Sequence, residues 1–175
     1  MHIHVKTEMQ KVKKNPSLDL SGTGYCASFN FRKTARAVTS LFDTALQKSG
    51  IRSTQFAILV GIAKSQPVSI GALANLLVID DTTLTRSLRL LQTEGFIAIS
   101  NRAAMRQRFL TITAKGERVL ARSLPAWRNA QERFVATIGP KYWLDLRKEL
   151  ENLAHVAVDL EKPQREVPDR EAIGS

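Results

Sequence analysis

The 175-residue sequence contains only one cysteine, which excludes an intrachain disulfide. It has only three histidines and no visible set of nucleophile, base and acid, so we expect no enzyme, no metal site and no cofactor. No apolar run is long enough to span a membrane, and the first residues are polar and basic, unlike a secretory signal. These absences predict a cytoplasmic protein with no membrane partner.

Acidic residues are also scarce, but only in part of the chain. The formal net charge is +10. Residues 1–43 contribute +4 to this charge and residues 44–116 contribute +6, whereas the positive and negative charges of residues 117–175 cancel. Charge that served only solubility would not be expected to be sorted in this way. The distribution favours nucleic acid or another anionic surface as a partner of the first two thirds of the chain.

Residues 68–113 have the pattern of two short helices followed by a hairpin. Ser69 and Asp80 are suitable N-caps for the two helices, and Gly95 fits the left-handed position that ends the second. Apolar residues recur at helical spacing, at Ile70, Leu73, Ala74, Leu77, Leu84, Leu88 and Leu91. Residues 96–99 and 109–112 are apolar and β-branched, as strands should be. This order predicts a winged helix-turn-helix, whose second helix enters the DNA major groove.

The face of the second helix opposite its leucines carries short hydroxyls and two arginines, with no carboxylate before Glu94. A solvated outer face normally mixes both signs of charge. Hydroxyls and backbone amides at a helix start can bind phosphate, and arginine can contact guanine edges or phosphates. The alternative is an ordinary amphipathic surface helix. The adjacent hairpin favours DNA, because residues 101–108 contain three arginines and no acid, and a basic wing can reach a minor groove.

The remaining pattern is helical on both sides of this module. We expect a helix over residues 25–48, a second over 54–64 capped by Ser53 and apolar almost all round, a third over 114–138 capped by Thr113, and a fourth ending near residue 160. Many apolar residues of the last two helices need a covering surface: Val119, Leu120, Leu124, Trp127, Phe134, Trp143, Leu146, Leu150 and Leu153. A second copy of the chain is the simplest cover, and a symmetric dimer would present two recognition helices to a pseudo-palindromic site.

The chain resembles the MarR family of dimeric bacterial regulators over about residues 29–153. The resemblance is carried by residues 52–56 (RSTQF), 70–74 (IGALA), 81–86 (DTTLTR), 91–96 (LQTEGF) and 110–116 (LTITAKG) in this order and spacing. It implies a homodimer with interlocked terminal helices and a winged helix-turn-helix in each subunit. It also implies a transcriptional regulator, usually a repressor, released by a small ligand or by cysteine oxidation. The wing of the family often carries Asp-x-Arg, but here Ala104 stands in place of the aspartate before Arg106.

We therefore predict a mainly α fold with a small β-hairpin wing. Its parts are a mobile basic arm (1–24), one domain (25–160, with dimerisation helices at 25–50 and 114–160 and the winged helix-turn-helix at 51–113) and a disordered tail (161–175). The predicted DNA-binding residues are Ser69, Thr82, Thr83, Thr85, Arg86, Arg89, Arg102, Arg106 and Arg108. Two other functions remain open: a winged-helix module for protein–protein assembly, and non-specific binding of DNA.

Two regulatory hypotheses also follow from the sequence. Aromatic walls with one cation suit a small aromatic carboxylate or phenol, and we expect such a pocket to be lined by Phe31, Arg32, Arg36, Phe42, Phe56, Trp127 and Phe134. The alternative is that these aromatic residues form the dimer core. Cys26 lies where the first helix should start, a position that favours the reactive thiolate. Its oxidation could separate the dimer arms, or Cys26 could simply be a small buried apolar residue.

Overall fold

A computed structural model describes residues 19–102 and 107–161. The chain divides into two compact units, Met1–Val38 and Thr39–Ser175. The described part of the first unit contains a short 3₁₀ helix, η1 (Thr23–Tyr25), and the first turns of α1 (Ala27–Leu46). The end of α1 belongs to the second unit, where Gly50, at a φ of 77°, closes the 3₁₀ turn η2 (Gln47–Ser49) that follows it.

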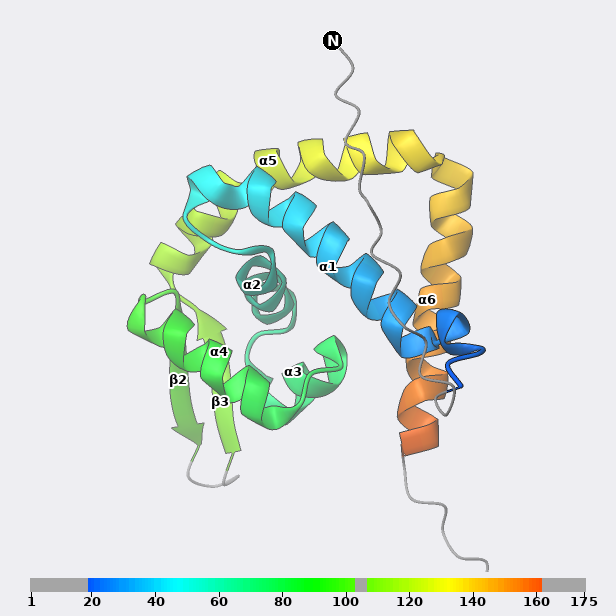
Figure 1. Ribbon diagram of the computed structural model, residues 1–175. Helices are drawn as coiled ribbons and strands as arrows, with labels where there is room; N and C mark the ends of the chain where they lie inside the picture. The colour runs from blue at the N-terminus through cyan, green and yellow to red at the C-terminus, as the bar shows by residue number, and fades with distance from the viewer. Residues whose placement is uncertain (1–18, 103–106, 162–175) are drawn as a thin grey trace, which may run out of the picture. The chain divides into compact units, whose positions relative to one another are not determined.

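The second unit is mainly helical with one small sheet, which confirms the predicted fold class (Figure 1). Its further elements are α2 (Ser53–Ser65), β1 (Val68–Ser69), α3 (Ile70–Leu77), α4 (Asp81–Thr93), β2 (Ile97–Arg102), β3 (Gln107–Ile112), α5 (Ala114–Ile138) and α6 (Pro140–Glu161). None of the helices in the described ranges is both long enough and apolar enough to cross a membrane.

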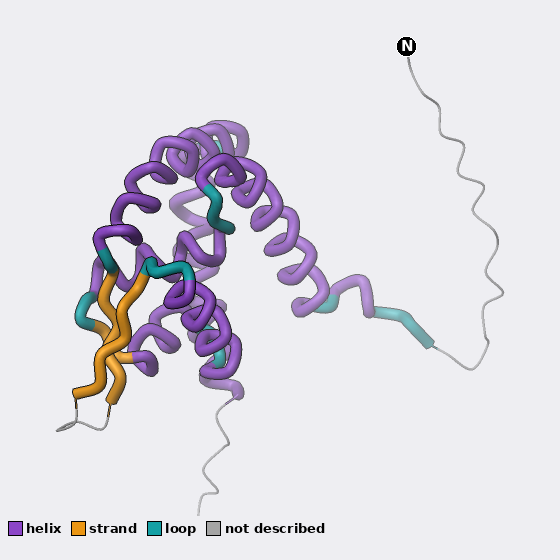
Figure 2. Tube along the Cα trace, turned by 90° about the vertical axis from the view of Figure 1, so that its left-hand side faces the viewer, coloured by secondary structure: helices purple, strands orange, loops and turns teal. Residues whose placement is uncertain are grey.

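The sheet has the order β1-β3-β2 and is antiparallel throughout, with its strands side by side (Figure 2). Leu110 in the central strand lies opposite Ile99 on one side and Val68 on the other. Strand β1 was not predicted from the sequence, because a strand of two residues has no measurable alternation. The predicted β2 and β3 were too short, because their outer ends are polar (residues 100–102 and 107–108) and only the backbone ladder extends them.

The core lies between α2, α3, α4, the sheet and the start of α5. Most of α2 is buried, as its nearly continuous apolar sequence predicts, with Leu59 and Ile62 fully covered. Gly116 at the start of α5 packs directly against the carbonyl of Phe96, where a Cβ would have no room. This close approach packs the start of α5 directly against the hairpin.

The predicted caps can be compared with the structure one by one. Ser69 and Asp80 cap α3 and α4, and Thr113 caps α5, as predicted. The prediction that Ser53 caps α2 was wrong, because the helix begins at Ser53 itself. The side chain of Gln55 instead accepts a hydrogen bond from the N–H of Arg52 at 2.8 Å, while Ser53 bonds to α1.

The apolar surface of α5 is covered in part by the chain itself. Val119 and Leu120 are buried in the core, and Leu124 and Trp127 pack against it. The expectation that these four residues require a partner chain was therefore wrong, since the winged module supplies their cover. Helix α6, by contrast, has no buried residue, and a partner chain as its cover stays a prediction.

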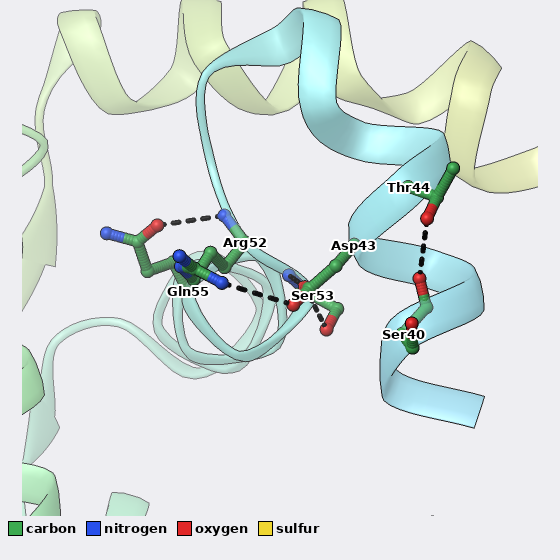
Figure 3. Close-up of polar contacts among 6 residues, drawn as sticks. All are labelled: Ser40, Asp43, Thr44, Arg52, Ser53 and Gln55. Atoms are coloured by element: carbon green, nitrogen blue, oxygen red, sulfur yellow. Dashed lines mark hydrogen bonds and ion pairs between the residues drawn. The ribbon is translucent and has the colours of Figure 1, made fainter. Parts of the chain in front are cut away.

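A polar contact ties α1 to α2 (Figure 3). Oδ1 of Asp43 accepts hydrogen bonds from both the N–H and the hydroxyl of Ser53, each at 2.7 Å, and Oδ2 lies 3.6 Å from the guanidinium of Arg52. Burial acts to raise the pKa of Asp43, but the bonds from Ser53 and the charge of Arg52 outweigh it and keep the pKa below its ordinary value of 3.8. The carboxylate is thus ionised at neutral pH.

We predict that Asp43→Asn lowers the free energy of unfolding by about 1–2 kcal/mol at neutral pH, as expected for lost hydrogen bonds to a charged group. Because the folded pKa is depressed, this contribution is complete above the unfolded value and is lost as the pH falls through the folded value. The difference between wild type and variant should therefore shrink below pH 3.8 in urea unfolding followed by circular dichroism.

The matched control is Asp145→Asn, which removes an exposed i,i+4 pair with Lys141 and should change stability little. A difference between wild type and Asp43→Asn that stays constant from neutral to acid pH would contradict the assignment.

Candidate nucleic-acid interface

The turn between α3 and α4 holds the two helices at a defined angle. Oγ of Ser69 accepts the N–H of Ala72 at 3.2 Å, which fixes the start of α3. The helix ends at Leu77, and the next residue, Val78, adopts the left-handed conformation with a φ of 50°. This is an uncommon backbone for a β-branched residue, and the bond from the N–H of Ile79 to the carbonyl of Ala74 at 3.0 Å helps to hold it. The chain then turns directly into the cap of α4.

Asp80 organises the first turn of α4. Its Oδ1 accepts the N–H of Thr83 at 2.9 Å. The hydroxyl and the N–H of Thr83 lower the pKa of Asp80, so this carboxylate is ionised at neutral pH. Negative charge at a helix N-terminus is favourable for the helix. Thr83 is therefore engaged in capping, and its side chain is less available to an external ligand than the sequence suggested.

The leucine stripe of α4 faces the core as predicted. Leu84, Leu88 and Leu91 are 0–1 % exposed. Consequently the opposite face is turned outward, and Thr82, Arg86 and Arg89 are exposed while Thr85 is half-buried. Within the described residues, neither Arg86 nor Arg89 forms an ion pair. Two guanidinium groups on this face thus have no ion-pair partner in residues 19–102 and 107–161.

A hollow of about 350 Å³ brings together the starts of α3 and α4 and the outer end of β3. Three residues predicted from the sequence, Ser69, Thr85 and Arg108, line it. The sequence analysis missed Asp81 and Gln107, which also line it. The sequence placed Asp81 beside the cap, and only the packing of β3 against the two helix starts shows that this carboxylate shares a site with Arg108.

The wing is anchored by its inner residues. Ile97 and Leu110 are buried, and the hydroxyl of Thr113 donates to the carbonyl of Gly95 at 2.7 Å. Arg108 is exposed on β3, opposite Asn101 on β2. The backbone of Arg102 ends β2, but its side chain lies outside the described residues, as does Arg106 entirely.

Three of the residues predicted for an effector pocket take part in two separate ring contacts within the second unit. The ring of Phe56 is in the core and stacks on Trp127 with centroids 5.7 Å apart. Phe134 makes an edge contact with Trp143 instead, at 5.9 Å. Phe42 is half-buried near the end of α1. Phe31, Arg32 and Arg36 are exposed in the first unit.

A different, largely apolar cavity of about 540 Å³ lies between α1 and α5. Its walls come from Leu41, Thr44, Ala45, Ala126, Asn129, Ala130, Arg133, Phe134, Thr137 and Ile138. It contains one cation, Arg133, and one aromatic ring, Phe134, so it has the chemistry expected of the effector pocket with mostly different residues. Several of its walls are small alanine side chains, which were not expected because the sequence was searched for aromatic walls.

Cys26 lies immediately before α1 and is exposed. The described residues contain no group of three or more histidine, cysteine, aspartate or glutamate side chains arranged to hold a metal.

Comparisons with known proteins agree with this architecture. A model of the MarR family matches residues 51–102. The DNA-bound transcriptional regulator MosR of M. tuberculosis is 31% identical and superposes with a TM-score of 0.70 over 78% of this chain and 98% of that one. CouR of Rhodococcus jostii RHA1, solved with p-coumaroyl-CoA, is 17% identical and shares the fold at a TM-score of 0.64 over 77% of this chain and 95% of that one. No curated protein matches the sequence.

Proposed function

The chain belongs to the MarR family of transcriptional regulators, and from this premise we propose that it is a homodimeric repressor of a pseudo-palindromic DNA operator. Family membership also makes it a regulator and not an enzyme, as the sequence predicted. The observation that carries the proposal is the outward face of α4, which presents Arg86 and Arg89 without intramolecular partners in the described chain. The relative MosR, 31% identical, was solved in complex with DNA.

In this proposal α4 enters the major groove, with Thr82, Thr85 and Arg86 at base edges. Ser69 and Thr83 contact phosphates at the helix starts, which favour anions, and Arg89 contacts a phosphate further along α4. The wing arginines 102, 106 and 108 act on the neighbouring backbone or minor groove. Asp81 adds an acceptor for a base amino group, or orients Arg108 across the hollow that both line.

The exposed apolar side of α6 supports dimerisation. Tyr142, Leu153, Val156 and Leu160 share one side of this helix and are 46–81 % exposed, and none of the 22 residues of α6 is buried. Exposed apolar surface on this scale marks an interaction site. A second copy fits best, since two copies would present two α4 helices to one dyad-symmetric site. In the proposed organisation, a winged helix-turn-helix (51–113) lies in the sequence between dimerisation helices at 25–50 and 114–160. The arm and the tail flank this domain, and most of their residues lie outside the described ranges. We propose that the protein is bacterial and cytoplasmic.

We predict a stable dimer in sedimentation at micromolar concentration. Leu153→Lys, which places a charge in the proposed interface, should weaken association at least tenfold, and the control Lys148→Ala should not. A wild-type monomer under these conditions would refute the dimer.

We predict that Arg86→Ala weakens binding to a specific site far more than to random DNA, because one base contact contributes about 1–3 kcal/mol of discrimination. The site is first selected from random-sequence DNA with the wild-type protein, and affinities are then measured by gel shift with competitor DNA. Arg128→Ala, an exposed arginine of α5 outside the proposed surface, is the control.

Equal losses on both DNAs would restrict Arg86 to phosphate contact. The same assay separates the other two functions. A protein-assembly module would bind no DNA at this surface, and a non-specific binder would yield no selected site.

Regulation by a small aromatic acid or phenol is supported by the cavity between α1 and α5. Its apolar walls would take the ring, and Arg133 would take the carboxylate or phenolate. A ligand there separates α1 from α5 and favours a dimer whose recognition helices no longer match half-sites about 34–36 Å apart. The competing trigger is oxidation of the exposed thiol of Cys26.

We predict that salicylate-like acids release the protein from DNA, and that Arg133→Ala raises the concentration needed at least tenfold, while Arg128→Ala does not. Peroxide is tested in parallel on wild type and Cys26→Ser. Release by peroxide that persists in the serine variant would eliminate the thiol, and no response to any aromatic acid would eliminate the cavity as an effector site.

A further inference from the structure

Helix α5 contains a proline in its middle. Pro125 is preceded and followed by more than two turns of continuous helix, from Ala114 to Ile138. A proline at this position has no N–H to bond the carbonyl of Ala121, and its ring presses against that carbonyl. Sharp bends in helices arise at such residues. In Figure 1, α5 changes direction along its length, so this helix is bent.

Ser123, two residues before Pro125, also favours a bend in α5. The hydroxyl of Ser123, which is fully buried, donates to the carbonyl of Val119 at 2.7 Å. A serine that bonds the carbonyl four residues earlier also bends helices. Pro125 itself is exposed, so no core contact explains its presence. Two residues that lie two positions apart in α5 thus each favour a bend in this turn of the helix.

The two halves of α5 pack against different parts of the unit. Before the bend, Val119 and Leu120 belong to the core of the winged module, and the guanidinium of Arg122 donates to the carbonyl of Ser49 at 2.9 Å. After the bend, residues 126–138 line the cavity with α1 and lead into α6. The bend is the junction between the segment that carries the recognition helix and the segment proposed to dimerise.

We propose that Ser123 and Pro125 are positioning residues that set the half-site spacing this protein accepts, an inference that rests on the proposed DNA-binding dimer. The 13 residues after the bend form a lever of about 20 Å at 1.5 Å per residue. A change of about 10° at the bend moves the far end of this lever by about 3.4 Å, which is one base-pair step. A modest angular preference at one turn thus selects between operators that differ by one base pair.

The test compares wild type, Pro125→Ala and Ser123→Ala on operators whose central spacer is lengthened or shortened in single base pairs. We expect Pro125→Ala to move the preferred spacing by at least one base pair or to reduce the discrimination between neighbouring spacings about tenfold. Ser123→Ala should do the same to a smaller extent. Glu132→Ala, an exposed change on the same helix, is the control. The proposal is overturned if Pro125→Ala prefers the same spacer length as wild type and discriminates equally well between neighbouring spacer lengths.

A second measurement does not require DNA or a dimer. Spin labels at Gln92→Cys on α4 and Glu149→Cys on α6, in a Cys26→Ser background diluted with unlabelled protein, report one intrachain distance across the bend. We expect Pro125→Ala to change the mean distance or narrow its distribution. An unchanged distribution overturns the role of Pro125 even if operator binding is confirmed. A changed distribution without sequence-specific DNA binding instead refutes the proposed function and retains the bend as the determinant of geometry.

Discussion

The burial of three leucines of α4 is the constraint on which the proposed interface depends. Leu84, Leu88 and Leu91 are almost completely covered, and each contributes about 1.5–3 kcal/mol when buried. Rotating the helix by one residue, about 100°, would remove this stripe from the core and bury arginine or threonine instead. The rotation of α4 is therefore set by its apolar side, and the exposure of Arg86 and Arg89 is its consequence. The Asp80 cap and the left-handed Gly95 define where this exposed face begins and ends.

The same logic explains what could be predicted from the sequence. Helix caps, positive-φ glycines and periodic leucines are local signals, and Ser69, Asp80, Thr113 and Gly95 were placed correctly from them. The start of α2 was misjudged because Ser53 is a good capping residue whose hydroxyl is instead used by Asp43, ten positions earlier in the chain. The hydrogen bond to Asp43 outweighed the capping preference of Ser53, and residues 50–56 alone give no sign of that bond.

The features that were missed depend on packing between distant segments. The cavity beside Arg133 exists because small side chains of α1 and α5 meet, such as Ala45 and Ala130. Of the aromatic residues expected there, Phe134 lines it, whereas Phe56 and Trp127 stack on each other elsewhere. Asp81 and Arg108 line one hollow only because the outer end of β3 lies beside the starts of α3 and α4. Pro125 is different, since it was visible in the sequence. Its consequence depends on what each half of α5 contacts, and this is known only once the fold is known.

The central claim is that two copies of α4 enter successive major grooves on one face of the DNA. Hydroxyl-radical footprinting of the wild-type protein on its selected site tests it most directly. The account predicts two equivalent protected regions related by the dyad of the site, with centres about one helical turn or a whole multiple of it apart, and weaker protection where the wings lie. A single protected region, or protection spread without phase along the fragment, would contradict the account.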